Sequence, residues 1–304
     1  MRENSKRYRR LEDEEIADKI DRMELTMERW RESHLAGDQD YIFVNIPSFH
    51  AEVWADGEEK MNFDVVVGRS TRRCDRETET WVYPDATPVV MSAMDHNMVN
   101  PPWFVPDRLR REVLEPRLAQ NPNYYEENGY EEIELANGRK ALQQVPGENN
   151  ALGLAKFIFP NEHNVYLHDT PHKQFFEYDR RAYSHGCIRV SKPLELAEFL
   201  FKWKGRDDLN VYEMIEDDRI LKIDFEQELP VMIEYYTVWV DDHGEPQFLE
   251  DLYRKDARRM SDDPDEFDRC TPRRRAPRRA APVVEMLDVD DEVDVEAIED
   301  DVGP

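Results

Sequence analysis

Hydrophobic residues recur with different periods along this chain, and each period predicts a different kind of element. Between residues 16 and 30 the apolar positions are spaced alternately by four and three residues, which is one face of an amphipathic helix. That face consists of Ile16, Ile20, Met23, Met27 and Trp30. We therefore expect residues 1–38 to hold a helix that packs through this face on the domain behind it.

Short runs rich in β-branched and aromatic residues dominate the central part of the chain. They lie at 41–46, 50–54, 61–68, 156–159, 164–168, 231–240 and 247–253, and residues typical of turns separate them. One helix is expected to begin near Pro193, because the apolar residues after it keep a helical spacing. These patterns predict a mainly β domain over residues 39–256.

Residues 101–145 interrupt the series of strands. Asp107 is a candidate N-cap for a helical stretch, although Pro116 should kink or end that helix. The residues that follow are polar and aromatic. We interpret this segment as a partly helical insertion between strands.

Two other segments are too charged to be expected in a packed core. Residues 69–85 are polar and aperiodic, which predicts a long surface loop. Residues 269–279 form a basic island broken by proline, and residues 285–301 hold ten acidic residues and no basic one. We expect residues 257–304 to be a charged, disordered tail, with an interaction arm whose halves attract each other as the alternative.

The composition excludes several classes of function. A formal charge of -27, from 68 acidic and 41 basic residues, opposes binding to a phosphate backbone, so no nucleic-acid partner is expected. No apolar run approaches the roughly 18 residues of a membrane span, and acidic residues stand where the apolar part of a signal peptide would follow the basic start. Three scattered cysteines are too few for a disulfide framework or a thiolate zinc site, and at least one must be free.

The candidate chemistry is concentrated between residues 166 and 190. His168 ends a predicted strand, and a turn of small residues, 184–187, ends at Cys187. A cysteine attacks as the thiolate, so it needs a basic partner, and His168 and His185 are the candidates. Gly186 allows backbone amides to point toward a developing oxyanion. This pattern predicts acyl transfer through a thioester.

Two other interpretations compete with catalysis. A cysteine among strands is often only a small buried hydrophobic residue. Four histidines also lie close together in sequence, which is compatible with a metal site: His163, His168, His172 and His185. Because no carboxylate or thiolate stands at a recurrent ligand spacing with them, nucleophilic chemistry is preferred and no metal is expected.

At these residues the chain resembles a known family. His168, a gap of fifteen residues and the turn Ser184-His185-Gly186-Cys187 with Arg189 resemble the signature of the YkuD-domain L,D-transpeptidases of bacterial peptidoglycan. The order of the other segments is most similar to the YcbB-like branch of that family. The segments are 23–31, 41–47, 65–68, 100–106, 146–153, 166–171 and 235–240.

The resemblance implies a mainly β, sandwich-like or barrel-like catalytic domain of the YkuD type, with a partly helical capping insertion at about 101–145. It implies that Cys187 attacks the bond between meso-diaminopimelate and D-alanine in a donor stem tetrapeptide. The resulting thioester then passes to the side-chain amine of an acceptor diaminopimelate. With water as acceptor, the enzyme would be an L,D-carboxypeptidase or would detach a protein from peptidoglycan.

The same resemblance implies the surroundings of the reaction. Peptidoglycan stem peptides are the expected partners, carbapenem-type β-lactams are expected covalent inhibitors, and neither a metal nor an organic cofactor takes part. The expected location is the periplasm or cell envelope, although no signal peptide is visible in this sequence. A non-catalytic wall-binding module is the alternative from another class.

The resemblance also assigns roles to individual residues. His168 is the expected general base, oriented by the backbone carbonyl of Asp169 rather than by its side chain. Gly186 and Cys187 are expected to supply the backbone donors for the oxyanion. His185 is expected to lie among the substrate-binding residues and to tune the site rather than act as the base.

Four further residues are expected to contact substrate. Arg189 is a candidate clamp for a stem carboxylate, with a structural salt bridge as the alternative. Tyr166 shares a strand face with His168 and should line the donor site, where Ser184 adds a polar group. Trp103, at the root of the insertion, either covers the stem or is a core aromatic.

Overall fold

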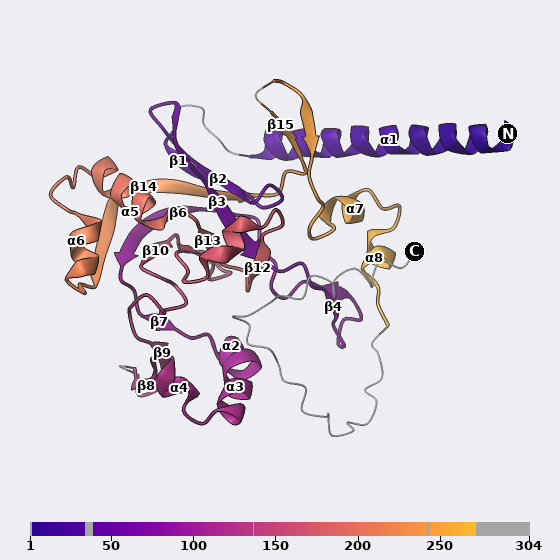
Figure 1. Cartoon of the computed structure of the whole chain (residues 1–304). Coiled ribbons are helices and arrows are strands. Elements are labelled where there is room, and N and C mark those ends of the chain that lie inside the picture. The colour runs from indigo at the N-terminus through magenta and orange to yellow at the C-terminus, as the bar shows by residue number, and fades with distance from the viewer. Residues whose placement is uncertain (1, 34–38, 136, 242, 272–304) are drawn as a thin grey trace.

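A mixed nine-stranded sheet forms the body of the protein (Figure 1), and the computed structural model describes residues 2–33, 39–135, 137–241 and 243–271. Its strand order is β12-β3-β13-β11-β10-β6-β14-β1-β2. Because β2 also pairs with β3, the sheet closes on itself as a barrel. The strands are β1 (Tyr41–Asn45), β2 (His50–Ala55), β3 (Glu58–Gly68), β6 (Val90–Val99), β10 (Ala155–Ile158), β11 (Leu167–His168), β12 (Ala182–Ser184), β13 (Ile188–Val190) and β14 (Leu221–Glu234).

The barrel encloses one large hydrophobic core. Along β2 buried and half-buried residues alternate, as they do in a strand with one face inward. β1 is buried on both faces: Ile42 and Val44 join the main core, whereas Phe43 joins a second cluster with Met232 and Tyr236. The prediction of a mainly β fold is therefore confirmed.

Two helices cover part of the barrel near its C-terminal half. α5 (Pro193–Trp203) begins with proline in its first turn, at the predicted position, and α6 (Val211–Glu216) follows it. Leu196, Ala197, Leu200 and Phe201 of α5 are fully buried against the core. Asn210 caps the N-terminus of α6, because its side chain accepts hydrogen bonds from the amides of Tyr212 and Glu213.

The insertion forms a small subdomain of its own, which lies below the barrel in Figure 1. Its elements are β7 (Trp103–Phe104), α2 (Asp107–Leu109), a π-helical turn (Arg110–Leu114), α3 (Glu115–Gln120), α4 (Tyr124–Glu127), β8 (Tyr130–Glu134) and β9 (Lys140–Gln144). The three strands pair in the order β7-β9-β8, and Val105, Leu114 and Leu142 form a separate core. We call this subdomain, residues 101–145, the cap.

The N-terminal helix α1 (Arg2–Glu32) packs on the barrel through a different face from the one its periodicity predicts (Figure 1). Leu25 and Thr26 are buried, whereas Ile16 is 56% exposed and Met27 is 50% exposed. Trp30 is the exception on the predicted face, because its ring stacks on Tyr236 at 4.9 Å. The contact is mainly polar, and arginine side chains of α1 make it.

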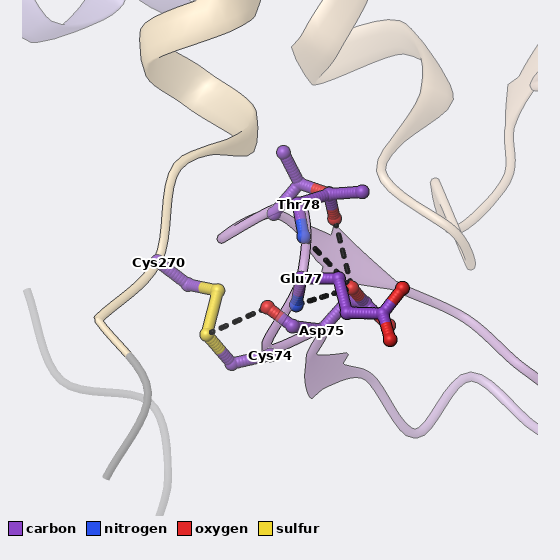
Figure 2. Close-up of a disulfide and its surroundings, with 6 residues drawn as sticks. Cys74, Asp75, Glu77, Thr78 and Cys270 are labelled. Atoms are coloured by element: carbon purple, nitrogen blue, oxygen red, sulfur yellow. Dashed lines mark hydrogen bonds between the residues drawn. A yellow bond between two sulfur atoms is a disulfide. The ribbon is translucent and has the colours of Figure 1, made fainter.

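Residues 69–85 and 257–271 are more ordered than their charge predicts. β4 (Arg73–Cys74) and β5 (Trp81–Val82) form a hairpin within the first segment, and the second contains the end of α7 (Lys255–Arg259) and α8 (Pro264–Asp268). A disulfide between Cys74 and Cys270 joins the two segments (Figure 2). The predicted disorder is thus wrong up to residue 271, because ion pairs and this covalent link hold the charged residues, and 272–304 lie outside the described residues.

The remaining hairpin follows β14. β15 (Val238–Val240) pairs with β16 (Pro246–Phe248), which agrees with the turn predicted between residues 240 and 247. Within the described residues, no helix has both the length and the apolar character needed to cross a bilayer.

Candidate active site

Two neighbouring strands of the barrel bring the predicted reactive residues onto one face. His168 on β11 lies opposite Arg189 on the parallel strand β13. Residues two apart on a strand share a face, so Tyr166 lies beside His168 and Cys187 lies beside Arg189. The T-shaped contact between the rings of Tyr166 and His168, at 5.6 Å, agrees with this placement. We call this set the reactive face.

The imidazole of His168 is buried and held in one orientation. Its Nδ1 donates a hydrogen bond to the backbone carbonyl of Asp169, which leaves Nε2 as the atom with a free lone pair. Burial lowers the pKa of His168 to about 3, and the positive charge of Arg189 acts in the same direction. His168 is therefore a neutral base at physiological pH.

The side chain of Asp169 supports the loop around the site rather than the imidazole. Its carboxylate accepts hydrogen bonds from the amides of Thr170, at 2.6 Å, and Leu154, at 2.9 Å, and it pairs with Lys173. Gly153 adopts φ +55°, and a Cβ there would lie 2.4 Å from the Asp169 carboxyl carbon. Asp169 thus acts on His168 only through its carbonyl oxygen.

The thiol of Cys187 meets Tyr166 rather than His168. The register of β11 and β13, continued by one residue, sets Tyr166 opposite Cys187, and the Asn164 carbonyl lies 4.0 Å from Sγ. Burial raises the pKa of the Cys187 thiol, while Tyr166 and the charges of Lys156 and Arg189 oppose that rise. Among the described residues no hydrogen bond joins Cys187 to His168, so the resting site holds a thiol and a neutral imidazole that are not paired with each other.

The turn before Cys187 is stabilised by its own polar groups. Ser184 Oγ donates to the Cys187 carbonyl at 2.5 Å and accepts from the Gly186 amide at 3.2 Å. Gly186 has φ +116°, a conformation that favours glycine, and Thr87 Oγ1 donates to its carbonyl at 2.9 Å.

These bonds change two of the expected roles. The Gly186 amide already has an acceptor, so of the two expected oxyanion donors only the Cys187 amide has no partner within the described part of the chain. Ser184 is buried and stabilises the turn instead of lining the substrate site.

Arg189 carries hydrogen-bond donors that have no partner among the residues the structure describes. Its guanidinium lies over the ring of Phe175, 5.4 Å from the centroid, and its Nε and Nη1 atoms are buried without a partner. Burial lowers the pKa of Arg189 to about 10, so it stays charged at neutral pH. No salt bridge of Arg189 is found among the described residues, and the open donors suit an anionic ligand.

Two contacts link the cap to the barrel, and one of them is at the reactive face. Burial raises the pKa of Tyr166 and Trp103 on β7 opposes that rise, so Trp103 lies near the Tyr166 hydroxyl. Its ring also packs against Tyr130 of the cap, with centroids 6.4 Å apart. Arg108 on α2 pairs with the buried carboxylate of Asp85 at 2.7 Å. A polar hollow of about 370 Å³ lies between the cap and the loop that follows the reactive face, at residues 171–172.

His185 belongs to the cluster of charged residues that holds the cap against the barrel. Asp85 pairs with Arg69, at 2.8 Å, as well as with Arg108. Burial lowers the pKa of His185 to about 4, Arg69 and Arg108 lower it further, and Asp85 opposes them. The charges that shift the pKa of His185 thus include the three residues of the cap contact, Asp85, Arg69 and Arg108.

Sequence reasoning did not single out Lys156, Asp85 or Arg69. Lys156 lies in a segment that was predicted as a strand, and Asp85 and Arg69 lie in a segment that was predicted as a polar loop. For Lys156 the one local indication of its position is the strand alternation in 156–159. Among the described residues no three His, Cys, Asp or Glu side chains group as metal ligands would.

Comparison with known proteins gives one family. The sequence model of YkuD, the L,D-transpeptidase catalytic domain, matches residues 39–204. A Haemophilus influenzae protein provisionally named as an L,D-transpeptidase is 31% identical over 231 residues, which cover 71% of this chain and 44% of that protein. The chain therefore spans less than half the length of this relative.

Similar solved structures are more distant. An L,D-transpeptidase from Mycobacterium smegmatis is 14% identical over 64% of this chain and 58% of its own, with a TM-score of 0.33. The Ldtfm-avibactam carbamoyl enzyme is 14% identical over 64% of this chain and 49% of its own, with a TM-score of 0.34.

Proposed function

This chain belongs to the YkuD family of L,D-transpeptidase catalytic domains, and from that premise we propose that it is a peptidoglycan L,D-transpeptidase that works through a Cys187 thioester. The donor is a stem tetrapeptide, cleaved between meso-diaminopimelate and D-alanine, and the acceptor is the side-chain amine of a second diaminopimelate. The order of its motifs favours a place in the YcbB-like branch.

The observation that carries the proposal is the reactive face itself. A thiol, a neutral imidazole with Nε2 free and a guanidinium with two unsatisfied donors lie on adjacent strands. A nucleophile, a base and an anion clamp are the groups that acyl transfer from a carboxylate-bearing peptide needs.

In the first half-reaction, His168 Nε2 takes the thiol proton as Cys187 Sγ attacks the carbonyl carbon of the donor bond. The Cys187 amide donates to the oxyanion, and the imidazolium then protonates the departing amine of D-alanine, leaving a thioester. Because Sγ has no hydrogen bond to His168 in the free protein, this pair must close when the donor binds, as catalytic hydrogen bonds commonly do.

In the second half-reaction, His168 takes a proton from the acceptor amine, which attacks the thioester carbonyl and releases the thiol. Arg189 holds a carboxylate of the donor stem through Nε and Nη1. Trp103 covers the stem from the cap. If water replaces the amine, the same steps give an L,D-carboxypeptidase or a hydrolase that detaches protein from peptidoglycan.

The proposed location is the periplasm or cell envelope, where the substrate lies. The Cys74–Cys270 disulfide supports this location, because disulfides persist in oxidising compartments and are rare in the cytosol.

The test is incubation of the full chain with a disaccharide tetrapeptide, followed by separation of the products. We expect free D-alanine and a cross-linked dimer, and their loss in Cys187→Ala and His168→Ala. His163→Ala, which changes an exposed histidine outside the reactive face, is the matched control and should keep activity. Monomeric tripeptide without dimer would identify the hydrolase instead, and binding to sacculi without any product would identify a wall-binding module.

A second readout uses a carbapenem, whose strained carbonyl should acylate Cys187. We expect intact-protein mass spectrometry to show one added inhibitor mass on the wild type and none on Cys187→Ala. An unmodified wild-type mass after prolonged incubation would contradict a functional nucleophile.

A further inference from the structure

Lys156 projects from β10 beside the reactive face. It pairs with His168 on β11 in the antiparallel ladder, so the two residues are direct cross-strand neighbours. Its Nζ atom lies 3.9 Å from the centroid of the Tyr166 ring, a close cation–π contact. The parallel register of β11 and β13, continued by one residue, sets Tyr166 opposite Cys187, and the Ile188 amide donates to the Tyr166 carbonyl at 3.1 Å. Tyr166 therefore neighbours both Lys156 and the nucleophile.

The ammonium of Lys156 has no carboxylate partner within the described part of the chain. Six other lysines there do: ion pairs join Lys19 to Glu15, Lys60 to Glu58, Lys140 to Glu132, Lys173 to Asp169, Lys202 to Glu198 and Lys222 to Asp224. A half-buried charge without a counter-ion is costly. The group that can supply the opposite charge at this place is Cys187, in its ionised form.

His168 is a poor source of positive charge for that anion. It is buried and lies between Lys156 and Arg189 in the strand register, with Lys173 nearby, so three cations oppose its protonation. The same positive potential favours a negative sulfur atom.

We propose that Lys156 is the positioning residue for the nucleophile: its ammonium, held against the Tyr166 ring, is the counter-charge that stabilises the Cys187 thiolate. The inference rests on the proposed function and deepens it, because it assigns to a lysine the part that an imidazolium plays in a thiol–imidazole pair. When the free protein ionises, the thiol proton passes to solvent and the charge left on Sγ faces Lys156.

The charged and titratable groups that face Cys187 come from three elements. They are Lys156 of β10, Tyr166 and His168 at β11, and Arg189 of β13. Because Arg189 remains when Lys156 is removed, the thiolate should become less stable but should still form. Burial lowers the pKa of Lys156, and the negative charge of Cys187 opposes that change.

The test measures the pKa of the thiol by alkylation with iodoacetamide over a range of pH. The thiolate displaces iodide and forms a thioether, and Cys187 is the free cysteine because Cys74 and Cys270 form a disulfide. We expect Lys156→Gln to raise the pKa of Cys187 by about one pH unit, which slows alkylation about tenfold at neutral pH. Lys156→Arg keeps the charge and should stay close to the wild type.

The matched control is Lys202→Gln, which removes an exposed lysine that pairs with Glu198 on α5. It should leave the pKa of Cys187 unchanged. The inference is wrong if Lys156→Gln alkylates like the wild type, or if Lys156→Arg slows alkylation as much as Lys156→Gln does, since a packing role alone would then explain the result.

A reciprocal measurement covers the case in which Lys156→Gln does not fold. In protein labelled with ¹³C-lysine, the pKa of Lys156 is read by NMR in the wild type and in Cys187→Ala, with Lys156→Arg used to assign the signal. Coupling is reciprocal, so loss of the thiolate should lower the pKa of Lys156. An equal value in both proteins would overturn the inference.

Neither measurement needs peptidoglycan, so the two proposals fail separately. Normal coupling of Lys156 and Cys187 without turnover of stem peptides would overturn the proposed function alone. Turnover of stem peptides, with a thiol pKa that Lys156→Gln does not change, would overturn the inference alone.

Discussion

At the reactive face, burial sets the ionisation of each residue more strongly than the net charge of the protein does. The chain carries a formal charge of -27, yet His168 is surrounded by Lys156, Lys173 and Arg189. The carboxylate of the next residue, Asp169, already pairs with Lys173 and two backbone amides. A positively charged pocket in an acidic protein suits a substrate that carries carboxylates.

The buried imidazole predicts how stability depends on pH. The pKa of His168 is about 3 in the folded protein against an ordinary value of 6.5, so between these values the unfolded chain binds a proton that the folded chain does not. Stability should therefore fall as pH decreases below 6.5, by about 2 kcal/mol for this residue at pH 5. His185, with a pKa of about 4, should act in the same direction.

Urea denaturation at pH 7 and pH 5 measures this effect. We expect His168→Asn, whose amide can still donate to the Asp169 carbonyl, to lose less stability between the two pH values than the wild type. His163→Asn changes an exposed residue and should keep the wild-type difference. Equal pH dependence in the wild type and His168→Asn would contradict the assignment.

At the scale of elements, α1 shows how a helix can dock through buried polar contacts. Arg29 pairs at 2.6 Å with Asp256, which is 1% exposed, and also donates to the Tyr235 carbonyl at 2.9 Å. Arg22 donates to the carbonyls of Thr237 and Leu249. These bonds satisfy carbonyl groups between β14 and β15 and directly after β16, so they fix which side of α1 faces the barrel.

Asp256→Asn should therefore loosen α1. The substitution removes the counter-charge of a half-buried arginine, a change that costs about 3–5 kcal/mol when such a pair is broken. We expect a lower melting temperature and faster hydrogen–deuterium exchange in residues 15–33. Asp262→Asn, at an exposed position nearby, is the control. Protection of α1 that survives Asp256→Asn would show that Trp30 and Leu25 hold the helix without the ion pair.

At the scale of the whole molecule, the disulfide joins the C-terminal end of the described chain to a hairpin in the first third of the sequence. Cys74 and Cys270 are 196 residues apart in sequence, and next to the bond Thr80 and Arg269 form a β-bridge. The turn between β4 and β5 is held by Asp75, which accepts hydrogen bonds from Thr78 and from the Glu77 amide (Figure 2). The β4–β5 hairpin and the segment after α8 are thus joined into one unit beside the barrel.

Reduction of this bond should destabilise the protein. In the chain-entropy description, a crosslink over so long a loop stabilises the folded state by at most about 5 kcal/mol. We expect a phosphine reductant to lower the melting temperature by several degrees. The double variant Cys74→Ser/Cys270→Ser should already melt lower and should not respond to the reductant. A response of equal size in the double variant would place the effect elsewhere.

The sequence alone determined the features that depend on local pattern. Strand alternation and turn residues predicted the mainly β content, and helical spacing predicted the helix that begins at Pro193. The closure of the sheet into a barrel did not follow from these patterns. Cys187, His168 and Arg189 were identified because a reactive motif keeps its residue types and spacing along the chain. The cap was predicted as an insertion, but its three-stranded sheet was not.

Only the tertiary structure decided which residues meet across long separations. The strand register places Lys156 opposite His168, and a disulfide joins Cys74 to Cys270. The Gly186 amide forms a hydrogen bond within its own turn, and α1 packs on the barrel through a mainly polar face. A periodic pattern reports that some face of an element is apolar, whereas the partner of that face depends on strand register and on the buried charges that must be neutralised. Strand register and the pairing of buried charges are set by contacts between distant segments, so the spacing of residues along the chain does not predict them.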